Sequence, residues 1–184
     1  MASATASLNL LMLSMDQTHA PTIATEHLRS VLGLIARCPT GDSTKDNLLQ
    51  VICNLTVPVG PRKTVESNGV VAMLVQVVMV GITPAVPNSS NNPKSPADFA
   101  SVLPADNKGT DTSADNTQLL GVAAALTALA NLAHGHVTLS TEDVMRSIWA
   151  ADHNVASQLV VLADYDDYDV SFGASQLLRA FGSV

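Results

Sequence analysis

The chain has 184 residues, of which 47% are apolar, 14% are charged and only 3% are aromatic. This composition excludes a disordered chain, a disulfide scaffold and a base-stacking surface, and it requires a core of Ala, Val, Leu and Ile. The net charge is −7, and the nine Lys and Arg residues are scattered. Nucleic-acid binding needs clustered cations, so we expect no nucleic acid and a basic or neutral protein partner.

The first predicted element is an apolar helix near residues 4–15, within a segment 1–24 that we interpret as a cap helix and linker. The longest apolar run, residues 70–82, has 13 residues, whereas a bilayer span needs about 20, so no membrane insertion is expected. Cys38 and Cys53 lie in apolar helical patterns and are predicted to be buried free thiols. Free thiols favour a reducing, intracellular and cytoplasmic setting.

Further along the chain, apolar residues recur at spacings of three and four, which predicts amphipathic helices around residues 28–35, 48–55, 122–132 and 155–162. Start signals precede several helices. We expect Asp42, Ser43 or Thr44 to cap one helix and Ser140 or Thr141 to cap another.

Two stretches need a separate interpretation. The valine-rich run 70–80 is predicted to be a helix, because no neighbouring run alternates with period two to provide a partner strand. Residues 83–115 contain five of the nine prolines together with many Ser, Asn, Thr and Asp residues. That composition buries too little surface to offset the entropy of ordering, which predicts a mobile insertion.

The helical segments form an internal repeat. The segments at 30–35, 72–77 and 157–162 align with one another, and each is followed by a second helix, at 47–55, 122–132 and 172–181 respectively. Equivalent positions Leu32 and Leu74 are 42 residues apart, which lies in the range of armadillo and HEAT units. The distance from Leu74 to Asn131 exceeds the usual one by about the length of the insertion. The insertion therefore lies within one repeat.

The residues resemble the armadillo repeat family. The stretch 66–75 (ESNGVVAMLV) is similar to the start of that family's second helix, and 52–55 (ICNL) and 129–132 (LANL) are similar to the end of its third helix. The resemblance implies a single all-α domain, a right-handed α-solenoid of about three repeats with an N-terminal capping helix. The predicted parts are repeat 1 at 25–58, repeat 2 at 61–133 with the insertion 83–115, and repeat 3 at 138–184.

The resemblance also implies a function. In this family stacked third helices line a concave groove, and asparagine amides bind the backbone of an extended peptide. That role falls here on Asn54 and Asn131, with Gln50, Thr127 and Gln176 one turn before the equivalent positions. The family's groove tryptophans are absent at those three positions. The structural alternative, held at equal weight, is that Asn54 and Asn131 tie neighbouring repeats together by hydrogen bonds to the backbone.

A second candidate surface is the acidic run between 164 and 169. Asp164, Asp166, Asp167 and Asp169 are interpreted either as a dock for a basic partner or, preferably, as the cap and solvated charge at the start of the last helix.

Catalytic signals are weak. His134, His136 and His153 are potential metal ligands, but an HxH pair alone is more typical of turn and surface histidines. No nucleotide, nucleophile-elbow or zinc-protease motif is present, and no cofactor is expected. The sequence thus predicts a non-catalytic protein-interaction module. A structural subunit fixed in a large assembly is the alternative, and a metal-dependent enzyme is a second, disfavoured one.

Overall fold

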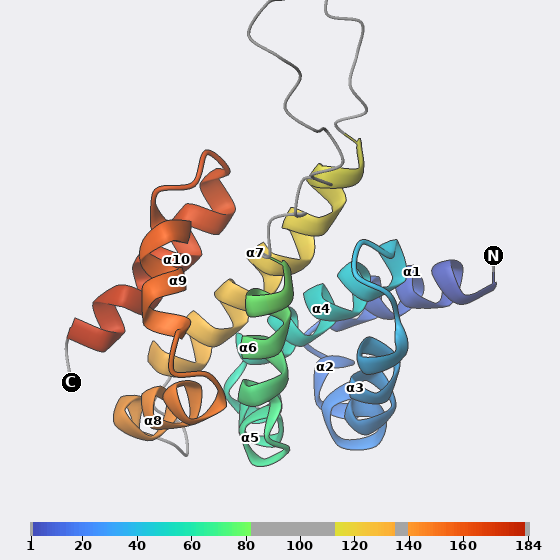
Figure 1. The fold of residues 1–184 in the computed structure, drawn as a ribbon. Helices are drawn as coiled ribbons and strands as arrows, with labels where there is room; N and C mark the ends of the chain where they lie inside the picture. Colours follow the sequence, from blue (N-terminus) through green and yellow to red (C-terminus); the bar gives the residue numbers. More distant parts are fainter. Residues whose placement is uncertain (1, 82–112, 135–139, 183–184) are drawn as a thin grey trace, which may run out of the picture.

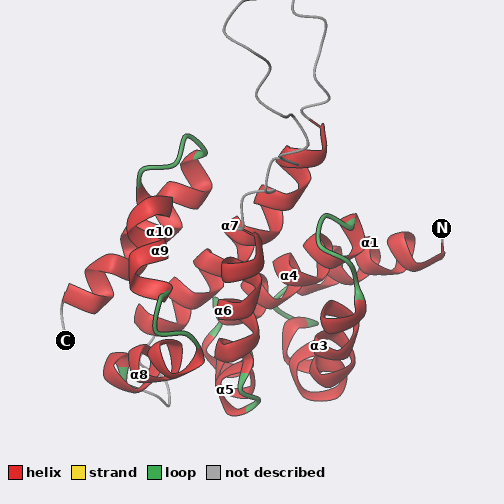
Figure 2. Cartoon of the chain, viewed as in Figure 1, coloured by secondary structure: helices red, strands yellow, loops and turns green. Residues whose placement is uncertain are grey.

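The computed structural model describes residues 2–81, 113–134 and 140–182, and every regular element in these ranges is helical (Figure 2). An all-α fold is therefore confirmed. The helices in chain order are α1 (Ala2–Ser14), α2 (Ala20–Thr22), the π-helix η1 (Ile23–His27), α3 (Leu28–Arg37), α4 (Ser43–Thr56), α5 (Val59–Ser67), α6 (Val70–Gly81), α7 (Ser113–His134), α8 (Thr141–Ala151), α9 (Val155–Ala163) and α10 (Tyr168–Gly182).

Several helices begin at the residues that the sequence predicts, because nearby side chains or glycines stabilise their first turns. The Asp42 carboxylate accepts a hydrogen bond from the Thr44 amide at 2.8 Å and caps α4. Gly69 has φ of +66°, a conformation that favours glycine, and this turn lets α6 begin at Val70. The valine-rich run is thus a helix, as predicted.

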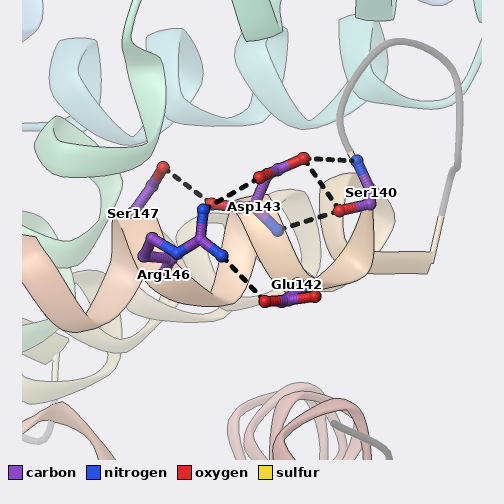
Figure 3. A network of polar contacts seen from close by, with 5 residues as sticks. All are labelled: Ser140, Glu142, Asp143, Arg146 and Ser147. Carbon is purple, nitrogen blue, oxygen red and sulfur yellow. Dashed lines mark hydrogen bonds and ion pairs between the residues drawn. The ribbon is translucent and has the colours of Figure 1, made fainter.

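Helix α8 begins with a capping box (Figure 3). Ser140 Oγ accepts from the Asp143 amide at 3.1 Å, and the Ser140 amide donates to Asp143 Oδ2 at 3.3 Å. The hydrogen bonds from Ser140 hold the pKa of Asp143 below its ordinary value. Arg146 pairs with Glu142 at 2.7 Å and with Asp143 at 3.3 Å. These exposed ion pairs add little stability, and the capping box sets the start of α8 at the place that the sequence predicts.

The main packing is a row of four helices, in which α1 contacts α4, α4 contacts α7, and α7 contacts α10 (Figure 1). Figure 1 shows α1 at one end of this row and α10 at the other. Helix α7 is its centre and also packs on α6, with Leu126, Leu129 and Leu132 buried among small alanines. Alanine and glycine allow the helix axes to approach closely: a Cβ on Gly173 would lie 2.8 Å from Leu126 Cβ.

Some expected boundaries differ from the structure. Helical backbone resumes at Ala20 and runs through the π-helix into α3, so the predicted linker up to residue 24 is shorter than expected. Helix α7 begins at Ser113, which makes residues 113–115 of the predicted insertion helical. The remainder of that insertion lies outside the described residues. Helix formation prevails at 113–115 because these residues continue directly into the apolar helix.

Both cysteines lie in or directly beside the helices where the sequence predicts them. Cys53 is buried and Cys38 is half-buried at the end of α3, and both are free thiols. The prediction of burial is thus correct for Cys53 and only partly correct for Cys38. Among the described residues, no single helix is long and apolar enough to cross a membrane, although α5 and α6 pass that test as a pair bent by 82°.

Candidate binding strip across helices α4, α7 and α10

The five residues predicted for the groove lie on three consecutive helices of the row. Gln50 and Asn54 lie one turn apart on α4, Thr127 and Asn131 one turn apart on α7, and Gln176 on α10. Thr127 is exposed and the other four are half-buried. We call these five residues the amide strip. None of them carries a charge, so the strip offers hydrogen-bond donors and acceptors without attracting either sign of charge.

The Asn54 amide connects α4 to α1. Its Nδ2 donates to Ser14 Oγ at 2.9 Å, and the buried Ser14 hydroxyl donates in turn to the Leu11 carbonyl at 2.7 Å. Gln50 Nε2 donates to Asn54 Oδ1 at 3.4 Å. Asn54 therefore connects two helices, as the structural alternative predicts, but its partner is a side-chain hydroxyl and not the backbone.

The Asn131 amide repeats this arrangement between α7 and α4. Its Nδ2 donates to Thr56 Oγ1 at 3.0 Å, and the fully buried Thr56 hydroxyl donates to the Cys53 carbonyl at 2.6 Å. Asn131 Oδ1 has no hydrogen-bond partner among the described residues, which leaves an acceptor available on the strip.

A third pair of the same design lies further along α1. Asn47 Nδ2 donates to Ser7 Oγ at 3.1 Å, and Ser7 donates to the Ala4 carbonyl at 2.9 Å. In every case an asparagine donates to a hydroxyl on the previous helix of the row. That hydroxyl donates in turn to the carbonyl three residues before it in its own helix. We refer to Ser7–Asn47, Ser14–Asn54 and Thr56–Asn131 as the hydroxyl–amide pairs. The three hydroxyls are buried, and each both accepts from an asparagine and donates to a carbonyl, so these pairs favour one register between the helices.

Among the described residues, no such pair joins α7 to α10. Ala180, which the sequence aligns with Asn131, is buried, and one polar contact between the two helices joins His134 Nε2 to the Gln176 carbonyl at 3.3 Å. Close packing of Gly173 on Leu126 takes the place of the amide. The Gln176 side chain makes no hydrogen bond within the described residues and remains part of the strip.

The sequence did not single out Ser7 and Ser14, yet one signal was present. These serines are seven residues apart, and their partners Asn47 and Asn54 are seven residues apart as well. Seven residues make two helical turns, so the two pairs fall on matching faces of adjacent helices. The matched spacing is the pattern from which both pairs could have been found.

Asp46 is a further residue that sequence reasoning missed. A Cβ on Gly121 of α7 would lie 2.6 Å from Asp46 Oδ1, and Asp46 Oδ2 is buried without a hydrogen-bond partner in the described part of the chain. Burial, with a smaller contribution from Asp42, raises the pKa of Asp46 to about 6. The glycine at 121 thus makes room for a carboxylate at the α4–α7 interface.

The acidic run connects α9 to α10. Asp167 Oδ1 accepts from the Val170 amide at 3.0 Å and so caps α10, while Asp169 lies in the first turn of that helix. Asp164, Asp166 and Asp167 line a hollow of about 540 Å³ together with Tyr165 and Leu119. The capping role preferred from the sequence is present at Asp167.

The candidate metal ligands lie in separate places. His134 contacts α10, as described above, whereas the His153 ring packs edge-on against Trp149 with ring centroids 5.9 Å apart. His136 lies outside the described residues. In the parts of the chain that the structure describes, no group of three His, Cys, Asp or Glu side chains lies close enough together to hold a metal ion.

The chain was also compared with known proteins. No protein-family model matches it, and comparisons with curated proteins and with solved structures give no significant match. The function is therefore inferred from the chain's own residues and geometry.

Proposed function

We propose that this chain is a small right-handed α-solenoid of about three armadillo-like repeats that acts as a non-catalytic protein-interaction module. The order of helices supports this arrangement. Helices α5, α6 and α7 form one group of three and α8, α9 and α10 form the next, and in each group the third helix is the longest, with 22 and 15 residues respectively. The bent segment from α2 to α3 with α4 forms the first group, and α1 caps the row.

The amide strip is the observation that carries the proposal. In a solenoid each repeat buries its apolar face only against its neighbours, so one side of the row remains a continuous surface. Here that row presents uncharged amide and hydroxyl groups from α4, α7 and α10. An amide side chain both donates and accepts, and it therefore fits the peptide unit of an extended partner whatever that partner's side chains are.

The hydroxyl–amide pairs leave hydrogen-bond donors and acceptors of the amide strip unpaired. A side-chain amide has two N–H donors and an oxygen with two lone pairs. Asn131 donates one hydrogen bond to Thr56, and its oxygen stays unpaired among the described residues. The side chains of Thr127 and Gln176 make no hydrogen bond to the described residues. The same amides can thus hold the helices in register and present a fixed row of hydrogen-bonding groups to a partner.

The chemistry of the surroundings indicates the kind of partner. The strip itself is uncharged, and the exposed Asp164 and Asp166 lie at the α10 end of the row. With a net charge of −7, the chain repels acidic ligands and favours a neutral or basic polypeptide. The free thiols of Cys38 and Cys53 suit a reducing, intracellular setting.

The test blocks the strip without touching the hydroxyl–amide pairs. Thr127→Arg places a long side chain in the middle of the strip, and Gln76→Arg makes the same addition on the exposed face of α6, away from it. Peptides selected from a random-peptide phage library on the wild-type chain are synthesised, and their affinities are measured by fluorescence anisotropy. We expect Thr127→Arg to weaken binding by about tenfold or more, or roughly 1.4 kcal/mol, and Gln76→Arg to leave it unchanged. If both variants bound the peptides equally well, the binding surface would not be the amide strip.

A second candidate function is that of a subunit fixed within a larger assembly. Large apolar side chains are exposed at the α10 end of the row, where Val160, Val161, Tyr168 and Phe172 are each at least half exposed. Exposed aromatic and branched residues of this kind are enriched at protein interfaces. Behaviour in solution separates the two functions: a peptide binder is monodisperse by itself, and a fixed subunit aggregates until its partner is co-expressed.

A further inference from the structure

The turn between α5 and α6 consists of Asn68 and Gly69, and the sequence contains no second Asn-Gly pair. An asparagine followed by glycine loses its side-chain amide more readily than one followed by any other residue. The reason is that glycine has no Cβ to hinder attack by its own backbone nitrogen. Asn68 is half-buried at the end of α5, and Gly69 is exposed, so this pair lies where solvent can reach it.

The structure explains why a glycine follows Asn68. Gly69 has φ of +66°, which a residue with a side chain rarely adopts, and an added Cβ would meet no atom within 4 Å. The glycine therefore serves the backbone conformation of the turn and not its packing. Because no side chain is packed at this position, local opening of the turn meets little resistance there.

In the folded turn, hydrogen bonds restrain both of the groups that would react. Asn68 Nδ2 donates to the Thr64 carbonyl at 2.8 Å, which ties the amide to the last turn of α5. The Gly69 amide, which contains the attacking nitrogen, donates to the Glu66 carbonyl at 3.4 Å. These bonds must break before the Gly69 nitrogen can attack Asn68 Cγ, so the reaction requires the turn to open.

We propose that Asn68 is a self-modification site, where attack by the Gly69 backbone nitrogen converts the amide into aspartate or isoaspartate at a rate set by opening of the α5–α6 turn. A bond forms between Gly69 N and Asn68 Cγ, the Cγ–Nδ2 bond breaks, and ammonia leaves with the proton of the Gly69 amide. Water then opens the resulting ring. Addition at Cγ gives aspartate, and addition at the backbone carbonyl carbon gives isoaspartate. One water is consumed and one ammonia released, and nothing is oxidised or reduced.

The surroundings of Asn68 admit the water that opens the ring. A hollow of about 260 Å³ is lined by Asn68 and Thr64 together with Arg29 of α3. A water molecule takes about 30 Å³ of liquid volume, so this hollow has room for several. The reaction therefore needs no reactant other than the chain and its solvent.

The products fit the turn less well than asparagine does. A carboxylate at residue 68 cannot donate to the Thr64 carbonyl, and it places a negative charge at the C-terminal end of α5, where the helix dipole disfavours it. Isoaspartate also lengthens the main chain between α5 and α6. Since Val70 and Leu74 of α6 are buried in the core, we expect the modification to lower the stability of the fold.

The test follows wild-type protein during incubation in mildly alkaline buffer, once folded and once unfolded in guanidinium chloride. Tandem mass spectrometry of a proteolytic digest locates each amide that has become a carboxylate and separates aspartate from isoaspartate. We expect both products at Asn68 in the folded protein, formed about tenfold or more slowly than in the unfolded chain, because two hydrogen bonds hold the turn closed. Asn54 and Asn131, each followed by leucine, are the internal controls and are expected to stay unmodified.

Two variants complete the test. Asn68→Gln keeps an amide, but its ring closure needs a larger ring, so we expect no product at residue 68 in either state. Asn68→Asp carries one of the products from the start and is expected to unfold about 2–4 °C below wild type.

Three results would overturn the proposal. Equal rates in the folded and unfolded chains would show that the turn does not control the reaction. Aspartate without isoaspartate would show direct hydrolysis by water in place of attack by Gly69. A folded protein with no product at Asn68, after the unfolded chain has been fully converted, would show that the site is silent in the native fold.

Discussion

Replacing glycine by alanine is expected to have opposite effects on stability at Gly173, where α10 packs on α7, and at Gly33 in α3. Gly173 lies inside α10, where an added Cβ would be 2.8 Å from Leu126 Cβ. Gly33 lies inside α3, where the nearest atom to an added Cβ is the distal Arg37 Nη2 at 3.9 Å. The first distance is far shorter than an ordinary contact of about 3.5–4.0 Å between carbon atoms, and the second is not.

Two effects compete in these variants. Replacing a helical glycine by alanine stabilises the helix by about 1 kcal/mol. Inserting a methyl group into a packed interface costs about 1–3 kcal/mol, because Leu126 Cβ is too close to the backbone of α7 to move aside. We therefore expect Gly173→Ala to lower the free energy of unfolding by about 1–2 kcal/mol, and Gly33→Ala to raise it by about 0.5–1 kcal/mol.

The assay is urea unfolding followed by far-UV circular dichroism. The denaturant dependence should stay the same for both variants, so that the change in midpoint reports the change in stability. A Gly173→Ala variant at least as stable as wild type would show that α10 does not pack on Leu126. The row of helices would then end at α7.

Two further predictions concern single ionisable groups. Burial raises the pKa of Asp46 to about 6 from an ordinary 3.8, so the folded state binds more protons than the unfolded state between these values, and stability falls as pH rises through this window. Asp46→Asn should thus unfold at a higher urea concentration than wild type at pH 7.5 and at the same concentration near pH 4; an equal difference at both pH values would contradict the burial of this carboxylate. Burial also raises the pKa of the Cys53 thiol to about 11, whereas Cys38 is half-buried. With Ellman's reagent at pH 8 one thiol per chain should react rapidly, Cys38→Ser should remove that phase, and two equal rates would be inconsistent with the structure.

Much of the secondary structure could be predicted because the signals are local. Asp42 and Ser140 cap their helices with their own side chains, and Gly69 supplies the positive φ of its turn. Each of these effects acts within a few residues of the chain. The helix over residues 70–80 could also be predicted, because no neighbouring run of the sequence alternates with period two to provide a partner strand.

The π-helix and the candidate site were harder to predict for physical reasons. The π-helix at Ile23–His27 contacts α5, which is far from it in the sequence, and no local residue type predicts a π-helix there. The sequence places Asn54 and Asn131 near the ends of two helices, and the structure has them in α4 and α7. Their partners Ser14 and Thr56 lie 40 and 75 residues away, so only the folded arrangement shows what the amides bind.

We propose that α1, α4, α7 and α10 stack in an open row, and that asparagine side chains hold neighbouring helices of this row in register. Nuclear Overhauser effects from the Asn131 side-chain amide protons test it most directly. The structure predicts a cross-peak to the Thr56 γ-methyl group, since the amide nitrogen lies 3.0 Å from the hydroxyl of the same side chain. Cross-peaks from that amide only to residues of its own helix would contradict the row, and with it the strip that we propose as the binding surface.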